Sequence, residues 1–189
     1  MENFENFVNK IKNCVKDVTF EIMRNNSLNQ DLLFVFLSGA TNCILVYDGN
    51  HSINEIAEIR YVARNGKCFI STFECDENFQ GNGIGKTIFN LALAHADALN
   101  IGNAYGYANP TNNIAGVSEE ENFEKEKQAL YTIYEKLGCT LKDVEVFENR
   151  AMEKRFEQTW THGDKLRNLS KKELVFVKKI VNLEKNLSQ

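Results

Sequence analysis

The chain has 189 residues, of which 43% are hydrophobic and 25% charged, as in an ordinary soluble globular protein with one domain and a substantial core. No apolar run is long enough to span a membrane, the charged start is not a signal peptide, and a net charge of -4 gives no reason to expect nucleic acid. The five cysteines are scattered without a C-x-x-C pair, which is typical of reduced thiols and predicts neither a disulfide framework nor a metal site. We therefore expect one cytoplasmic domain over residues 1–189.

The first part of the chain predicts a helix followed by several strands. Apolar side chains between Phe4 and Val15 recur at helical spacing, which predicts an amphipathic N-terminal helix. Strand patterns then follow at Thr19–Met23, Leu32–Leu37, Cys43–Tyr47, Ile56–Arg64 and Lys67–Cys75.

The last two of these strand patterns flank Asn65-Gly66, a pair suited to the positive φ angles of a type I′ hairpin turn. The turn fixes the register of the hairpin. Counting outward from it, we expect Val62 opposite Phe69, Tyr61 opposite Ile70, and Glu58 opposite Phe73.

The second half of the chain alternates helices and strands. We expect a helix over Ile84–Leu99, a strand over Ala104–Ala108, and a second helix that begins with the S-x-x-E capping box of Ser118 and Glu121. Gly138 is well placed to end that second helix.

The C-terminal part of the sequence is less regular. Val144–Phe147 favours a strand, Arg150–Trp160 fits no single element, and the partial alternation of Glu173–Val181 predicts a final strand. The order of elements predicts an α/β (α+β) fold, in which helices flank a mixed, mostly antiparallel sheet.

The segment Gln80-Gly81-Asn82-Gly83-Ile84-Gly85-Lys86, between a predicted strand and a predicted helix, is the most informative part of the chain. Its glycines let the backbone approach a ligand, and the following helix leaves its first N–H groups unpaired. Amides at the positive end of a helix dipole favour a phosphate, and Lys86 adds a cation. A glycine-rich turn without a ligand is the alternative.

Two nucleotide-binding motifs fail here by one residue each. A P-loop, G-x-x-x-x-G-K-[ST], needs a glycine where the chain has Gln80, and the dinucleotide fingerprint G-x-G-x-x-G needs one at Lys86. A P-loop nucleotide hydrolase therefore remains a minor alternative.

The pattern Q/R-x-x-G-x-G/A does fit, at Gln80, Gly83 and Gly85, and it resembles the acetyl-coenzyme A pyrophosphate loop of the GNAT superfamily of N-acetyltransferases. The segment Ile133-Tyr134-Glu135-Lys136-Leu137-Gly138-Cys139 resembles the L-Y-E-K-x-G-F segment of the same family, with Ile133 for leucine and Cys139 for the aromatic residue. The two segments follow the family's order, and the resemblance covers residues 56–139 best.

This resemblance implies a GNAT-like sheet whose central parallel strands, here Lys67–Cys75 and Ala104–Ala108, splay apart around acetyl-coenzyme A, with no metal. The strand end would contact the pantetheine arm, and the glycine loop would hold the pyrophosphate. Asn112 aligns with an asparagine that touches pantetheine, in a link that is longer here than in the family. The implied cofactor-binding residues are Phe73, Glu74, Cys75, Gln80, Gly81, Asn82, Gly83, Ile84, Gly85, Lys86 and Asn112.

The chemistry implied by the resemblance is attack of an amine on the thioester. Tyr134 matches the family's general-acid tyrosine, whose phenol can protonate the leaving thiolate, and a core aromatic is the alternative interpretation. A backbone N–H near Cys75 could stabilise the oxyanion.

The general base is harder to find. The family's glutamate positions carry Phe69 and Tyr107 here, which leaves Glu74 and Glu58 as candidates, each of which could equally be an ordinary strand carboxylate. We expect His95 to be a partly buried, hydrogen-bonded helix residue.

The sequence therefore predicts an N-acetyltransferase that acts on a primary amine of a small molecule or protein. Because the glutamate matches are missing, a catalytically weak or inactive acyl-coenzyme A-binding sensor or scaffold domain is the alternative. We expect no nucleic-acid or membrane partner, and both a monomer and a homodimer remain open.

Overall fold

The computed structural model describes residues 4–49, 53–108, 118–148, 151–161 and 169–187. The strands are β1 (Val18–Asn25), β2 (Gln30–Leu37), β3 (Asn42–Asp48), β4 (Asn54–Arg64), β5 (Lys67–Cys75), β6 (Asn103–Ala108), β7 (Thr140–Glu148) and β8 (Ala151–Thr161). The helices are α1 (Phe4–Cys14), α2 (Ile84–Ala98), α3 (Glu119–Lys136) and α4 (Lys171–Leu187), with a 3-10 turn η1 (Glu77–Phe79). The strands form one eight-stranded sheet in the order β1-β2-β3-β4-β5-β6-β8-β7.

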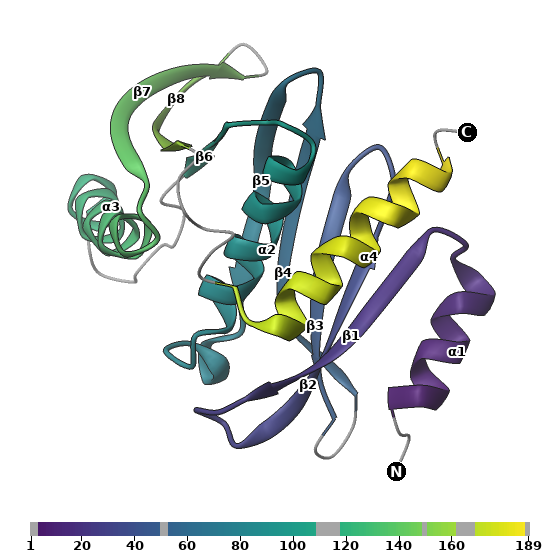
Figure 1. Cartoon of the computed structure of the whole chain (residues 1–189). Helices are drawn as coiled ribbons and strands as arrows, with labels where there is room; N and C mark the ends of the chain where they lie inside the picture. The colour runs from purple at the N-terminus through teal and green to yellow at the C-terminus, as the bar shows by residue number, and fades with distance from the viewer. Residues whose placement is uncertain (1–3, 50–52, 109–117, 149–150, 162–168, 188–189) are drawn as a thin grey trace.

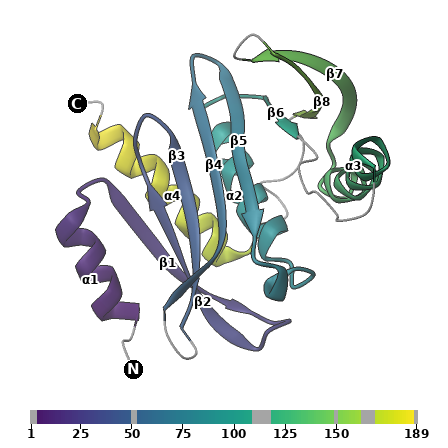
Figure 2. The ribbon, with the colours of Figure 1, turned by 180° about the vertical axis from the view of Figure 1, so that it is seen from behind.

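Helices cover both faces of the first half of the sheet. Figure 1 looks onto the face that α2 and α4 cover, and Figure 2 shows the strands from behind. In β2, Phe34 and Phe36 belong to the core beneath α2 and α4, whereas Leu33 and Val35 pack with Val8 of α1. The uninterrupted apolar run of β2 is therefore that of a strand buried on both faces. No helix among the described residues is long and apolar enough to cross a membrane.

The β4–β5 hairpin confirms the predicted turn, because Asn65 and Gly66 have φ angles of 54° and 72°. The register is as expected where Val62 faces Phe69 and Tyr61 faces Ile70. It then shifts, because Arg60 pairs with Thr72 and leaves Ser71 as the extra residue of a β-bulge.

This bulge makes one of our register predictions wrong. Glu58 faces Glu74, not Phe73, because one extra residue on β5 exchanges the faces of every side chain beyond it. Phe73 instead points to the helical face, where its ring centroid lies 5.5 Å from that of Phe89 in α2. The bulge therefore places an aromatic residue beneath the start of α2 and a carboxylate on the other face.

The predicted final strand over Glu173–Val181 is also wrong, because these residues lie in helix α4. Ser170 and Glu173 form a capping box, in which the Glu173 N–H donates to Ser170 Oγ at 3.3 Å and the Ser170 N–H to Glu173 Oε2 at 2.6 Å. Phe176, Val177 and Ile180 then form the buried stripe. The ambiguous segment before it, residues 151–161, is strand β8, which pairs with both β6 and β7.

The predicted splay of the central parallel strands is confirmed. Parallel pairing joins Cys68–Ile70 of β5 to Ala104–Gly106 of β6, and it goes no further along the two strands. Helix α3, which lies beside β7 in Figure 1, starts as predicted, because Ser118 Oγ accepts from the Glu121 N–H at 3.2 Å. The mixed, mostly antiparallel sheet flanked by helices is thus as expected.

Candidate active site

A cavity of about 750 Å³ lies beside the end of β5, where β6 no longer pairs with it. Three parts of the fold enclose it: the end of β5, the loop that leads through η1 into α2, and the C-terminal half of α3. The lining residues are Phe73, Glu74, Cys75, Glu77, Phe79, Gln80, Gly81, Gly83, Ile84, Gly85, Lys86, Leu130, Ile133, Tyr134, Lys136 and Leu137. The two sequence segments that resemble the GNAT family therefore face each other across one cavity.

The glycine loop is folded so that its backbone N–H groups stay available. Gly81 and Gly83 have φ angles of 78° and 79°, the left-handed conformation that glycine adopts without strain. The first N–H of this region with a backbone partner is that of Thr87, which donates to the Gly83 carbonyl at 3.0 Å. Within the part of the chain that the structure describes, the N–H groups from Gly81 to Lys86 have no such partner.

The carbonyl groups of the same loop are, in contrast, bonded by side-chain amides. Gln80 Nε2 donates to the Cys75 carbonyl at 3.2 Å, and Asn82 Nδ2 lies 3.4 Å from the Phe79 carbonyl and 3.3 Å from the Gln80 carbonyl. Asn82 was predicted as a cofactor contact, but its side chain turns back to the loop and is not among the residues that line the cavity. The loop thus presents donors, which suits an anion.

Gly85 allows the first turn of α2 to approach β5 closely. A Cβ atom added there would lie 3.2 Å from Phe73 Cζ, tighter than ordinary van der Waals contact. Glycine at this position therefore allows the helix N-terminus to sit directly against the end of β5.

The backbone of β5 directs another donor toward the gap between the strands. The Asp76 N–H donates to the Ile56 carbonyl on β4 at 2.9 Å. Because N–H groups alternate sides along a strand, the N–H of Cys75 points away from β4, to the side that β6 has left. This is the amide that the resemblance implies for the oxyanion.

Tyr134 lines the cavity from α3 and is only 6% exposed. Burial, with a smaller contribution from Cys139, raises the pKa of its phenol to about 12. Its ring centroid lies 6.3 Å from that of Phe73, the residue that also packs on α2. The phenol is therefore protonated at neutral pH and can donate a hydrogen bond or a proton into the cavity.

The charged residues of the cavity come from different elements of the fold. Lys86 and Lys136 come from the two helices, whereas Glu74 and Glu77 come from the end of β5 and from η1. Glu74 and Glu77 also line a second hollow of about 380 Å³, together with Cys75, Asp76 and Asn78. Lys136 is a cation that the motif comparison did not assign to binding, and no signal in the sequence indicates it, because its place on the cavity depends on the position of α3.

Three carboxylates lie together on the β4–β5 face opposite α2. Burial, and then the charges of Glu58 and Glu74, raise the pKa of Glu55. Glu58 accepts hydrogen bonds from Arg60 Nε and, at 3.2 Å, from Cys43 Sγ, so its oxygen is already engaged. Of the two candidate bases, Glu74 is the one that lines the cavity.

An aromatic cluster occupies the positions where the resemblance would place a glutamate. The ring centroid of Phe69 lies 5.2 Å from that of Tyr105 and 6.0 Å from that of Tyr107. No group of three or more His, Cys, Asp or Glu side chains is placed to hold a metal in the described ranges. Asn112 lies outside the described residues.

His95, at the other end of α2, is more deeply buried than we expected, with no exposed surface. One ring nitrogen lies 2.8 Å from the Tyr61 hydroxyl and the other 3.0 Å from Glu184 Oε2. The partial burial expected from helical spacing is wrong because α4, predicted as a strand, packs over this end of α2. Both ring nitrogens of His95 are therefore engaged in contacts inside the protein.

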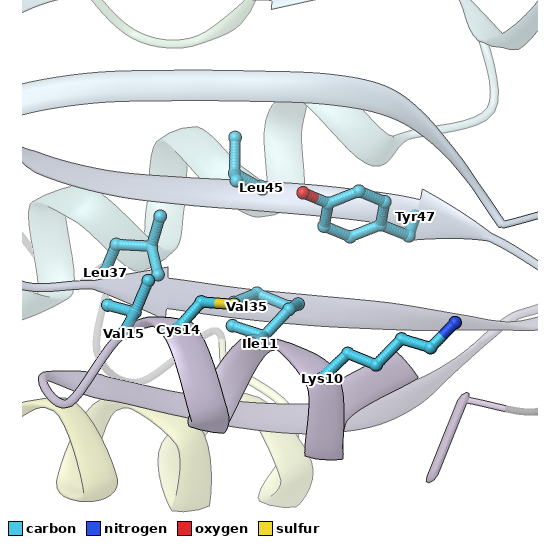
Figure 3. A pocket seen from close by; sticks show the side chains of 8 residues that line it. All are labelled: Lys10, Ile11, Cys14, Val15, Val35, Leu37, Leu45 and Tyr47. Atoms are coloured by element: carbon cyan, nitrogen blue, oxygen red, sulfur yellow. The ribbon is translucent and has the colours of Figure 1, made fainter. Parts of the chain in front are cut away.

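A further cavity of about 290 Å³ lies on the opposite face of the sheet, under α1. Figure 3 shows its lining, which is Lys10, Ile11, Cys14, Val15, Val35, Leu37, Leu45 and Tyr47. Its walls are mostly apolar and contain no glycine loop or helix N-terminus, in contrast to the cavity at the end of β5.

No protein-family model matches the chain, and no curated protein matches its sequence. Among solved structures, a mutant of a cAMP-binding acyltransferase from Mycobacterium smegmatis is similar to this chain, with a TM-score of 0.57 and 10% sequence identity. The similarity covers 95% of this chain and 60% of the chain of that structure. A GNAT-family protein from Desulfovibrio desulfuricans has a TM-score of 0.48 at 10% identity, over 65% of this chain and 69% of its own. A Bacillus subtilis acetyltransferase in complex with CoA has a TM-score of 0.42 at 14% identity, over 65% of this chain and 77% of its own. At 10% identity, the likeness to the cAMP-binding acyltransferase structure shows a shared fold and no more.

Proposed function

We propose that residues 1–189 form one N-acetyltransferase domain, which transfers the acetyl group of acetyl-coenzyme A to a primary amine of a small molecule or protein. The observation that carries this proposal is the glycine loop: its N–H groups from Gly81 to Lys86 have no backbone partner among the described residues, and all of these residues except Asn82 line a cavity of about 750 Å³. Exposed and half-buried N–H groups gathered at the N-terminus of a helix, where the helix dipole is positive, suit a ligand with anionic acceptor oxygens.

The cofactor would lie along the gap between β5 and β6. Its diphosphate would accept from the loop amides and the first turn of α2, with Lys86 and Lys136 as nearby cations. Its pantetheine arm would run along Phe73–Cys75, where the backbone of β5 has no pairing to β6. Asn112 belongs to this proposal through the family resemblance alone.

The proposed reaction uses two donors and one acceptor. A neutral amine attacks the thioester carbonyl, and the Cys75 N–H stabilises the oxyanion that forms. The carbon–sulfur bond then breaks, and Tyr134 gives its proton to the leaving thiolate. Glu74 takes the proton released by the amine, directly or through water, and we assign it the role of general base.

The charge distribution supports an amine as the acceptor. Alkylamines are cationic in neutral water, and Glu74 and Glu77 make the side of the cavity next to β5 and η1 acidic. Such a field concentrates a cation in the cavity, whose two lysines favour the phosphates of the cofactor.

A second candidate is a coenzyme A-binding sensor or scaffold domain with little or no turnover. The aromatic cluster of Phe69 and Tyr107 favours it, because these rings occupy the positions where the family resemblance would place a catalytic glutamate. This candidate shares the cofactor site with the enzyme and differs in the fate of the thioester.

Two measurements separate these candidates. Calorimetry with acetyl-coenzyme A tests the shared site, and the absence of binding to folded protein at millimolar cofactor would reject both. Release of free thiol with a panel of amines, covering peptide N-termini, lysine, polyamines, aminoglycosides and small amino acids, tests turnover. Binding without amine-dependent thiol release across the panel would favour the sensor.

A further inference from the structure

The β1–β2 hairpin reaches the glycine loop through one side chain. Asn25, at the end of β1, donates from Nδ2 to the carbonyl of Asn82 at 3.0 Å, across 57 positions of sequence. This carbonyl lies between Gly81 and Gly83, the two left-handed glycines of the loop. Asn25 is therefore a contact from outside the loop to its central peptide.

The orientation of the Asn25 amide is fixed by a second bond. Its Oδ1 accepts from the Leu28 N–H at 2.9 Å, within the same hairpin. A backbone N–H can only donate, so the oxygen must face Leu28 and the NH₂ group must face Asn82. The turn of the hairpin thus presents a donor to the loop.

The direction of the Gly83 N–H follows from this contact. In a trans peptide the carbonyl and the N–H of the next residue point in opposite directions. Because the Asn82 carbonyl is held toward Asn25, the Gly83 N–H is turned the other way, and Gly83 is among the residues that line the cavity.

Apart from that contact, the peptide between Asn82 and Gly83 makes no hydrogen bond of its own to the described residues, although the Asn82 side chain bonds the loop. Glycine adopts positive and negative φ with similar ease, so a peptide that precedes Gly83 can rotate at low cost. A rotation would replace the donor with a carbonyl oxygen, which repels phosphate.

We propose that Asn25 is a positioning residue for the cofactor, which locks the Asn82–Gly83 peptide so that the Gly83 N–H faces the diphosphate. The role of the diphosphate rests on the proposed function, whereas the orientation of the peptide does not. Asn25 acts through the loop and is not assigned any contact with the reacting atoms.

The test compares three single variants by calorimetry with coenzyme A and by the amide resonance of Gly83. Asn25→Ala removes both bonds of the side chain. Asn25→Asp keeps the oxygen that accepts from Leu28 but replaces the donor to Asn82 with a second oxygen. Asn29→Asp is the control, because it adds the same charge to the same hairpin at a side chain bonded to Arg24, and its φ of 54° is one that aspartate tolerates.

We expect both Asn25 variants to weaken coenzyme A binding by roughly three- to tenfold, the range for loss of one hydrogen bond, while Asn29→Asp binds like the wild type. The KM for acetyl-coenzyme A should rise with kcat unchanged, and the Gly83 amide resonance should move or broaden in the ligand-free Asn25 variants. A thermal melt confirms that each variant is folded.

The outcomes separate the two proposals. If the wild type binds coenzyme A and both Asn25 variants bind equally well, the positioning role is overturned and the proposed function stands. If the wild type does not bind, the proposed function is overturned, and the ligand-free Gly83 resonance decides about Asn25. An unchanged resonance in both variants contradicts the proposed orientation.

Discussion

The two ends of helix α2 differ in whether their polar groups have hydrogen-bond partners within the protein. At the C-terminal end, His95 is fully buried and each ring nitrogen has a partner, in Tyr61 and Glu184. At the N-terminal end, the N–H groups from Gly81 to Lys86 find no backbone acceptor among the described residues, although they adjoin a cavity. A polar group paired inside the protein indicates a structural role, whereas donors gathered at a helix N-terminus beside a cavity suit an anionic ligand.

The largest effect is expected for Tyr134→Phe, which removes the acid while keeping the ring in the wall of the cavity. The measurement is thiol release at saturating acetyl-coenzyme A. We expect kcat to fall by about 100-fold, the scale of general-acid catalysis, with coenzyme A affinity nearly unchanged. Tyr131→Phe is the control, because that hydroxyl lies on the same helix and donates to Asp143. Equal activity of the two variants would exclude Tyr134 as the acid.

A smaller effect separates the ligand-binding glycine from a structural one. Gly83 and Gly66 have φ angles of 79° and 72°, so alanine costs roughly 1–2 kcal/mol of strain at either position. In calorimetry, we expect Gly83→Ala to weaken coenzyme A binding by about tenfold, because the loop relaxes and turns its amides. Gly66→Ala should lower the free energy of unfolding alone. If Gly83→Ala and Gly66→Ala bind coenzyme A with the same affinity, the glycine loop does not bind the diphosphate.

The next effect concerns the lysines of the cavity. Lys86→Ala and Lys136→Ala should each weaken coenzyme A binding a few-fold at low ionic strength, and the loss should shrink as salt screens the charges. The control is Lys125→Ala, which removes an exposed lysine that pairs with Glu121 on the same helix as Lys136. If all three variants bind coenzyme A equally well, Lys86 and Lys136 do not bind its phosphates.

The smallest effect on function is expected at the other end of α2. Burial alone would raise the pKa of Glu184, but the bond and charge of His95 and the bond from Asn42 lower it below its ordinary value. A lowered pKa stabilises the fold above the ordinary glutamate range near pH 4.3, and this stability is lost as pH falls through the lowered value.

Glu184→Gln should therefore cost about 1 kcal/mol of unfolding free energy at pH 7 and less at lower pH, with coenzyme A affinity unchanged. Chemical denaturation of both proteins across this pH range is the measurement. A constant difference between them at every pH would show that the ionised carboxylate contributes nothing.

Local features of the fold could be predicted from the sequence. The Asn65-Gly66 turn and the Ser118 capping bond depend on neighbouring residues, and the structure confirms both. The capping box at Ser170 and Glu173 is equally local, but the apolar residues of α4 also alternate in part, and this alternation favours a strand.

Other features depend on distant residues and could not be predicted from the sequence. The bulge at Ser71 exchanges the faces of Phe73 and Glu74, and no residue of the hairpin signals it. The contact of Asn25 with the Asn82 carbonyl joins a hairpin to a loop far along the chain. The placement of Lys136 on the cavity required the position of α3.

Titration of ¹⁵N-labelled protein with coenzyme A shows whether the amides from Gly81 to Lys86 bind the diphosphate. We expect these resonances to move together and reach saturation, while the amide of Gly66 in the distant hairpin turn stays in place. Unchanged resonances from Gly81 to Lys86 in folded protein at millimolar coenzyme A would contradict the proposed binding of the diphosphate.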